Sequence, residues 1–140
     1  MIIREIKDLI ENNNYGVLAT SYEGFPLSSP VEYYLNDGNE IFIPSVGGNK
    51  FKNLNINNNV CLLVNSKFED NFRMKGVQIF GKASIYDKNT DTFDMASKYI
   101  DDTEVLLDDQ TKIIKISPVK IIYLNSLKTG EKIKYEVEIN

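Results

Sequence analysis

The hydrophobic residues of this chain follow a helical period at its start and a period of two over much of the remainder. Ile6, Leu9 and Ile10 recur at the spacing of one helix face. This helix is expected to begin near Ile2 and to end at the three asparagines 12–14. From residue 15 onward β-branched and aromatic residues dominate, and the pattern predicts strands.

Three strands are predicted next, joined by short polar connections. Glycine in the connections 23–26 and 36–39, with proline in the first, favours tight turns. The strands delimited in this way are 15–22, 27–35 and 40–44.

Strands and short helices alternate in the rest of the chain. The period of two is clearest over residues 77–85, so one face of this strand is expected to be buried. Helical spacing predicts two short helices, 49–57 and 91–100. The remaining predicted strands are 60–65, 112–124 and 132–139, the last two forming a hairpin around Lys128-Thr129-Gly130.

These elements, about seven strands and three short helices, predict mainly antiparallel β structure. Strands in hairpin order with few long crossovers favour a small closed antiparallel barrel over a parallel doubly wound sheet. No repeat or low-complexity linker interrupts the 140 residues. A single domain over residues 1–140 is therefore expected.

Composition excludes several kinds of site. The chain contains no histidine and one cysteine, which excludes Ser-His-Asp triads, intramolecular disulfides and most zinc sites. Cys61 stands in an apolar run and is expected to be a small buried hydrophobic residue. A net charge of −4 argues against a nucleic-acid partner. The lack of a signal-like or membrane-spanning apolar run indicates a cytoplasmic protein with no membrane partner.

The segment 44–50 is the strongest candidate for a binding site. It joins a predicted strand end to a predicted helix start, where free backbone N–H groups and the helix dipole favour an anion. Ser45, Asn49 and Lys50 add side-chain donors, and the Gly-Gly pair lets a ligand approach the backbone. The spacing differs from a triphosphate-binding loop, so a phosphate monoester fits better. A surface turn with a solvated Lys50 is the alternative.

Two other charged features stand outside this segment. The five carboxylates of the stretch 101–109 lack the order of a calcium loop, and a solvated surface loop is expected. Arg73 and Lys75 precede the strand 77–85 and could contact a ligand or a neighbouring chain, although charges at strand starts are common.

Several short segments occur in a characteristic order along the chain. They are Tyr-Gly-Val-Leu-Ala-Thr at 15–20, Ser-Pro-Val at 29–31, Ile-Phe-Ile at 41–43, Gly-Asn-Lys at 48–50 and Gly-Val-Gln-Ile-Phe-Gly-Lys-Ala at 76–83. In this order the chain resembles the pyridoxamine 5'-phosphate oxidase-like proteins from about residue 6 to residue 124. These proteins are split β-barrels that bind FMN, so the resemblance implies that fold and that cofactor.

The resemblance implies where the flavin phosphate would bind. The family's Ser-Arg-Lys phosphate segment falls on Gly48-Asn49-Lys50. Lys50 keeps the positive charge, Asn49 replaces an arginine, and Gly48 offers only its backbone. With Ser45, these residues form the phosphate side of the expected site.

The resemblance also implies where the flavin ring would lie. The segment along the isoalloxazine edge falls on Ser28-Ser29-Pro30-Val31, where Ser28 replaces an arginine of the true oxidases. The glutamine that the family supplies from the partner chain falls on Gly76. That contact is therefore missing or comes from Gln78 or Lys75.

Departures from the family bear on activity. True oxidases carry Tyr, Arg and Ser on the helix after the Gly-x-Ala strand and an Arg-x-His near the C-terminus, and this chain has neither. The resemblance therefore implies an FMN-dependent oxidoreductase acting on an unknown small-molecule substrate, not a pyridoxine phosphate oxidase, with the flavin carrying the chemistry. A deazaflavin in place of FMN stays open. The alternatives are a flavin-binding or cofactor-free stress or regulatory protein without turnover and, against the acidic charge, an oligonucleotide-binding barrel.

The resemblance finally implies a homodimer with shared flavin sites. Family members hold FMN between two chains, and so short a chain is not expected to enclose the cofactor alone. The side of the strand 77–85 that carries Phe80, with Tyr86 next to it, supplies apolar surface for pairing. Twofold symmetry then gives two sites per dimer.

Overall fold

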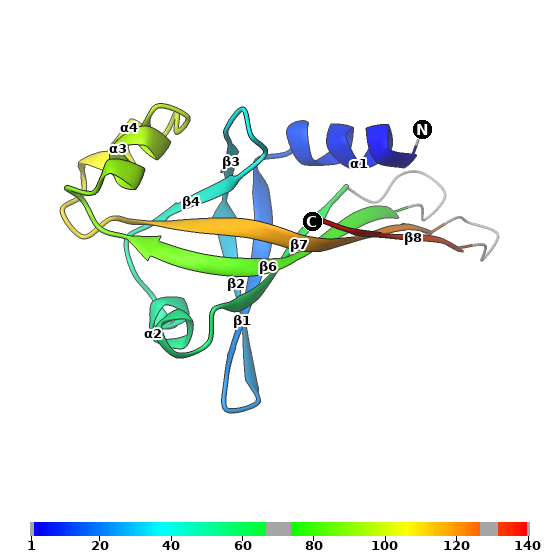
Figure 1. Ribbon diagram of the computed structural model, residues 1–140, viewed down its shortest axis with the longest axis horizontal. Coiled ribbons are helices and arrows are strands. Elements are labelled where there is room, and N and C mark those ends of the chain that lie inside the picture. The colour runs from blue at the N-terminus through cyan, green and yellow to red at the C-terminus, as the bar shows by residue number, and fades with distance from the viewer. Residues whose placement is uncertain (1, 67–73, 127–131, 140) are drawn as a thin grey trace.

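The computed structural model describes residues 2–66, 74–126 and 132–139. Within them the chain forms four helices and eight strands (Figure 1). The helices are α1 (Ile2–Glu11), α2 (Asn49–Ile56), α3 (Asp91–Ser97) and α4 (Thr103–Leu107). The strands are β1 (Tyr15–Tyr22), β2 (Phe25–Glu32), β3 (Tyr34–Leu35), β4 (Ile41–Ser45), β5 (Asn59–Asn65), β6 (Met74–Tyr86), β7 (Lys112–Ser126) and β8 (Lys132–Glu138).

The strands form one antiparallel sheet that curls into the split barrel expected from the sequence. Their order is β2-β1-β5-β6-β7-β4-β3. The long strand β7 carries β6 along one side, whereas β4 pairs with its first half and β8 with its second half. In Figure 1, β6 and β7 cross the whole view, with α3 and α4 near one end and α1 above the other.

A bend at Tyr33 carries the chain from one edge of the sheet to the other. β2 and β3 stand at opposite ends of the strand order, yet only Tyr33 separates them in sequence. The phenol is 2% exposed, and its hydroxyl donates to the carbonyl oxygen of Ile10 at 2.6 Å. The Tyr33 N–H donates to the carbonyl oxygen of Asn14 at 2.9 Å. The single strand predicted over 27–35 is therefore wrong, because the chain turns inward to anchor the end of α1.

Side chains divide between an inner core and a smaller outer cluster. The inner core is built on fully buried strand residues such as Leu18 and Ile79, and α1 and α2 pack against it. The outer cluster gathers Phe42, Ile113 and Phe93, so that α3 covers the outward side of β4 and β7. β4 is consequently buried on both faces over Ile41–Pro44.

The strand β6 is longer than predicted, and its partner β7 has a bulge at Val119. β6 begins at Met74 and ends at Tyr86, and its register against β7 shifts between Phe80 and Gly81. A Cβ at Gly81 would lie 2.5 Å from the carbonyl oxygen of Ser117. Only glycine therefore allows the two backbones to approach this closely at the bulge.

The other differences from the sequence predictions are local. The acidic stretch expected as a loop contains α4, because the Asp102 side chain caps this helix by accepting the N–H of Val105 at 3.1 Å. The hairpin turn at 128–130 and Arg73 lie outside the described residues. None of the helices in the described ranges is long and apolar enough to cross a bilayer.

Candidate functional site

The predicted anion segment connects the end of β4 to the start of α2. Gly48 is the residue before the first turn of α2 and has a φ of 115°, a conformation that favours glycine. No side chain caps this N-terminus. The Phe51 N–H donates to the carbonyl oxygen of Gly48 at 3.3 Å, and the preceding N–H groups of the first turn can donate to an acceptor from outside the helix.

Lys50 folds back over this loop and is not the solvated side chain of a surface turn. It is only 9% exposed, and its Nζ donates to the carbonyl oxygen of Gly47 at 2.6 Å. Ser45 Oγ donates to the same oxygen at 3.2 Å. The ammonium also lies 5.4 Å from the centroid of the Phe51 ring. The side chains of Ser45 and Lys50 thus converge on one backbone acceptor.

The charge of Lys50 is not balanced by a carboxylate within residues 2–66, 74–126 and 132–139. None of the described acidic residues forms an ion pair with its ammonium. Burial lowers the pKa of Lys50 from its ordinary value, because removing the ammonium from water disfavours its charged form. A buried cation without a counter-ion is costly, and an anionic ligand would lower that cost.

A second base, Lys112, adjoins this loop and was missed from the sequence. Lys112 is the Cα partner of Ser45 across the β4–β7 pair. Its Nζ lies 5.9 Å from the Phe51 centroid, so both lysines approach the same ring. It pairs with Asp87 at 3.4 Å, and its side chain is about half exposed. Lys112 is 67 positions from Ser45 in sequence, and only the strand register brings the two together.

The polar side of α2 holds the helix against β1. Asn53 Nδ2 donates to Thr20 Oγ1 at 3.1 Å, and Asn57 Nδ2 donates to Ser21 Oγ at 3.1 Å. Leu54 reaches the inner core, whereas Lys52 is exposed. The start of α2, and with it Lys50, is therefore fixed relative to the sheet.

The other predicted segment, Ser28 to Val31, lies on the edge strand β2. Ser29 and Val31 pair with Leu18 and Gly16 on the inner face, and Val31 is 8% exposed. Ser28 and Pro30 are exposed on the outer face.

The two predicted segments lie on the two sides of the split in the sheet. Tyr34 of β3 pairs with Phe42 of β4. If the same register continued beyond Tyr33 into β2, Val31 would lie across from Ser45. The strand pairs of the described sheet include none between β2 and β4, although these strands are in contact. Backbone groups along this edge of β2 are therefore free of ladder hydrogen bonds. Val31 and Ser45, one from each predicted segment, thus lie on the two strands between which the ladder is interrupted.

The residues expected to reach a partner chain differ in their placement. Gly76 is buried on β6, between Asn65 on β5 and Leu124 on β7. Gln78 is half-buried on the outer face, across from Leu63. Lys75 stands one position from Gly76 and so points to the opposite face of the sheet. Of the two expected substitutes, Gln78 is the one on the outer face.

The outer face of the barrel carries an apolar patch against which none of the four described helices is packed in a hydrophobic cluster. Its members are half-buried and belong to neither hydrophobic cluster: Val17, Ala19, Cys61, Leu63, Phe80 and Ile122. The prediction that Cys61 is a buried core residue is therefore wrong, because the side chain is only half-buried on the outer face. Its partial burial still raises the pKa of the thiol. Tyr86 is half-buried, across from Ile113. We refer to the six residues as the outer apolar patch.

The acidic residues near β2 form no metal site. Burial raises the pKa of the Glu32 carboxyl, with further contributions from Asp102 and Asp101, whereas a hydrogen bond with Tyr15 opposes the shift. Across the residues that the structure describes, no three Cys, Asp or Glu side chains are grouped so that they could hold a metal ion. The structure thus gives this acidic region no cation-binding role.

Comparisons with known proteins agree with this architecture. The family model described as Pyridoxamine 5'-phosphate oxidase matches residues 2–125. No curated protein matches the sequence. General Stress Protein 26 from Bacillus anthracis is 21% identical, with a TM-score of 0.69, and the match covers 96% of this chain and 100% of that chain.

Two further solved structures share the fold. A FAD-binding protein from Mesorhizobium loti is 16% identical, with a TM-score of 0.71, over 85% of this chain and 89% of that chain. A heme binding protein from Mycobacterium smegmatis is 18% identical, with a TM-score of 0.75, over 96% of this chain and 56% of that chain. At these identities the likeness concerns the fold alone.

The buried charge of Lys50 predicts a pH-dependent cost in stability. Because its pKa is lower in the folded than in the unfolded chain, the unfolded state binds more protons between the two values, and the free energy of unfolding rises with pH there. At pH 7 the full cost is present. Lys50→Met is therefore expected to raise the free energy of unfolding in urea at pH 7, and its advantage should shrink as the pH approaches 10.5.

The exposed Lys52 on the same helix provides the control. Lys52→Met should leave the urea midpoint nearly unchanged at every pH, since exposed substitutions change stability by about 0.5 kcal/mol or less. A Lys50→Met protein less stable than the parent at pH 7 would contradict a net cost of burying this ammonium.

Proposed function

Because this chain belongs to the pyridoxamine 5'-phosphate oxidase family, we propose that it is an FMN-binding oxidoreductase whose flavin phosphate binds at Ser45, Gly48, Asn49 and Lys50. The observation that carries the proposal is the buried Lys50 ammonium, which lacks a carboxylate partner among the described residues. A phosphate would provide the missing negative charge beside the uncapped start of α2.

The residues of the loop fit a phosphate monoester. Lys50 Nζ and Ser45 Oγ both donate to the carbonyl oxygen of Gly47. A phosphate oxygen is a stronger acceptor than a carbonyl, so these donors would move to it at little geometric cost. A Cβ at Gly48 would lie 3.1 Å from Lys50 Nζ, which means that a side chain there would crowd the ammonium. Lys112 adds a second positive charge at the edge of the loop.

The flavin ring would lie along Ser28, Ser29, Pro30 and Val31. Their strand has an edge without ladder hydrogen bonds, and backbone groups there can donate to and accept from a ring edge. Bound FMN would supply hydride or electron transfer, and the chain's own residues would bind the cofactor, orient it and shield it from water. No side chain of this chain is assigned a catalytic role.

The proposed site is completed by a second copy of the chain. The residues of the outer apolar patch belong to neither hydrophobic cluster. Burying this apolar surface against a second chain would favour association. Gln78 lies within this face, across from Leu63. We assign to Gln78 a contact with the flavin held by the partner, in place of the contact that Gly76 cannot make.

The names of the structural neighbours suggest other cofactors. One neighbour is a FAD-binding protein, and FAD contains the same isoalloxazine ring and the same first phosphate as FMN. Another is a heme binding protein. Heme is not proposed here, because a chain without histidine lacks the most common axial ligand. A flavin-binding or cofactor-free stress or regulatory protein without turnover is the second candidate, since Ser28, Asn49 and Gly76 replace polar flavin contacts.

Flavin titration of matched lysine variants tests the binding site. Lys50→Ala should weaken FMN binding about ten- to a hundred-fold, because one charge-assisted contact contributes roughly 1.5 to 3 kcal/mol. Lys52→Ala changes an exposed lysine of the same helix and should bind nearly as the parent does. The absorbance spectrum of the purified protein and the mass of the released cofactor identify the flavin. An unchanged affinity of a folded Lys50→Ala protein would reject the assignment.

Turnover separates the two candidate functions. We expect no detectable oxygen consumption with pyridoxine phosphate, because the chain lacks the arginine and histidine that hold this substrate in true oxidases. Rates near about 10 per second would contradict that reading. Anaerobic bleaching of bound FMN by a nicotinamide donor is expected of an oxidoreductase. Flavin that stays oxidised with every donor supplied would favour the protein without turnover.

Sedimentation measurements test the shared site. The parent is expected to be a dimer at micromolar concentration, and Leu63→Glu should give a monomer with weakened FMN binding, because it places a charge in the outer apolar patch. Leu107→Glu is the matched control on α4, since Leu107 is 79% exposed and lies outside the patch. A monomeric parent that still binds one FMN per chain would remove the shared-site proposal and leave the barrel unaffected.

A further inference from the structure

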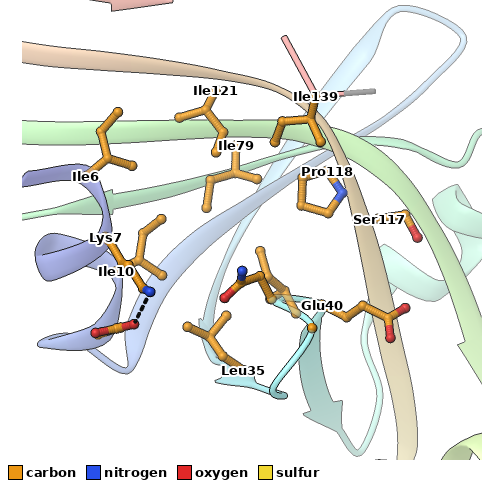
Figure 2. A pocket seen from close by; sticks show the side chains of 14 residues that line it. Ile6, Lys7, Ile10, Leu35, Glu40, Ile79, Ser117, Pro118, Ile121 and Ile139 are labelled. Atoms are coloured by element: carbon orange, nitrogen blue, oxygen red, sulfur yellow. Dashed lines mark ion pairs between the residues drawn. The ribbon is translucent and has the colours of Figure 1, made fainter. Parts of the chain in front are cut away.

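A cavity lies between α1 and the middle of the sheet, away from the proposed phosphate loop. It has a volume of about 560 Å³, within the range of small-molecule sites. Figure 2 shows Ile6 and Ile10 of α1 opposite Ile79, Pro118 and Ile121 of β6 and β7. None of its fourteen lining residues belongs to the proposed flavin-binding set. The cavity is therefore a separate feature of the barrel.

The walls of this cavity are held in place by hydrogen bonds. Asn36 Oδ1 accepts the N–H of Gly38 at 3.0 Å and that of Glu40 at 2.9 Å, which fixes the turn between β3 and β4. On the opposite side the N–H of Ile139 donates to the carbonyl oxygen of Val119 at 2.7 Å. Ile41 and Ile79 form a floor that is 2% and 1% exposed. The space is thus preformed and larger than the voids between packed side chains.

The lining indicates the chemical class of the ligand. Its apolar members are branched aliphatic residues and one proline, and no aromatic side chain lines it. The charges at its rim are balanced: Lys7 Nζ lies 3.9 Å from Glu11, and Lys115 Nζ lies 2.8 Å from Glu40. The bond from Lys115 lowers the pKa of Glu40, so this carboxylate stays charged and paired. The rim therefore presents no net charge to attract an ion.

We propose that this cavity binds a neutral, mainly aliphatic small molecule at a site distinct from that of the flavin. Burial of the ligand's apolar surface against Ile6, Ile10, Ile79 and Ile121 supplies the driving force. The polar turn at Gly38 and Asn39 provides hydrogen-bonding groups for one uncharged polar end. The site stands on its own geometry and does not depend on whether the chain binds FMN.

Binding of a neutral fluorescent probe tests the site. N-phenyl-1-naphthylamine is expected to bind the parent protein saturably, at one molecule per chain. Ile10→Phe from α1 and Leu35→Phe from β3 each place a larger side chain in the cavity, and each should weaken probe binding about tenfold or more, because the ring occupies space that the probe needs. Leu107→Phe, at a 79% exposed position on α4, makes the same kind of change outside the cavity and should bind as the parent does.

Competition distinguishes a neutral ligand from an ionic one. Decan-1-ol should displace the probe. Decanoate should require about a tenfold higher concentration for the same displacement, because the paired charges at the rim offer its carboxylate no free cation. Circular dichroism and urea unfolding show whether the two filling variants remain folded, and one folded variant is sufficient for the test. No saturable binding to the parent, equal binding by a folded filling variant, or equal displacement by decanoate would overturn the proposal.

Discussion

The bend at Tyr33 is the constraint on which the barrel depends. A curled sheet has two edges, and here one run of chain forms both of them, as β2 before the bend and β3 after it. The buried Tyr33 side chain fixes the bend by its hydrogen bond to the end of α1, and its N–H adds a bond to the start of β1. Because the chain turns at this point, β2 and β4 come into contact without forming a ladder. The split that results is where both candidate flavin segments lie.

The candidate phosphate loop holds a positive charge that is largely buried. An ammonium that is 9% exposed and bonded to one carbonyl oxygen is less stable than the same group in water, as the lowered pKa of Lys50 reflects. Structures keep such strain at positions where a ligand relieves it. Asn53 and Asn57 attach α2 to β1, which fixes the position of the helix that carries Lys50.

The two faces of the sheet support different interactions. The inner face is filled by the core and, near α1, leaves the aliphatic cavity. The outer face is covered by α3 over β4 and the first part of β7, whereas none of the described helices belongs to a cluster over the outer apolar patch on β1, β5, β6 and β7. This division explains how one small domain could hold a flavin between two copies and a neutral ligand within each copy. Neither role requires a histidine, a metal or a disulfide, which agrees with the composition.

The sequence by itself determined the antiparallel class and most strand positions, and it predicted an anion site at the loop before α2. These features depend on neighbouring residues: alternation of apolar side chains, glycine in turns, and donors next to a helix start. The tertiary structure alone decided the bend at Tyr33, the burial of Lys50, the placement of Cys61 on the outer face and the approach of Lys112 to Ser45. Each of these depends on which distant strand lies alongside, and strand register is set by the packing of the whole sheet, not by any local pattern.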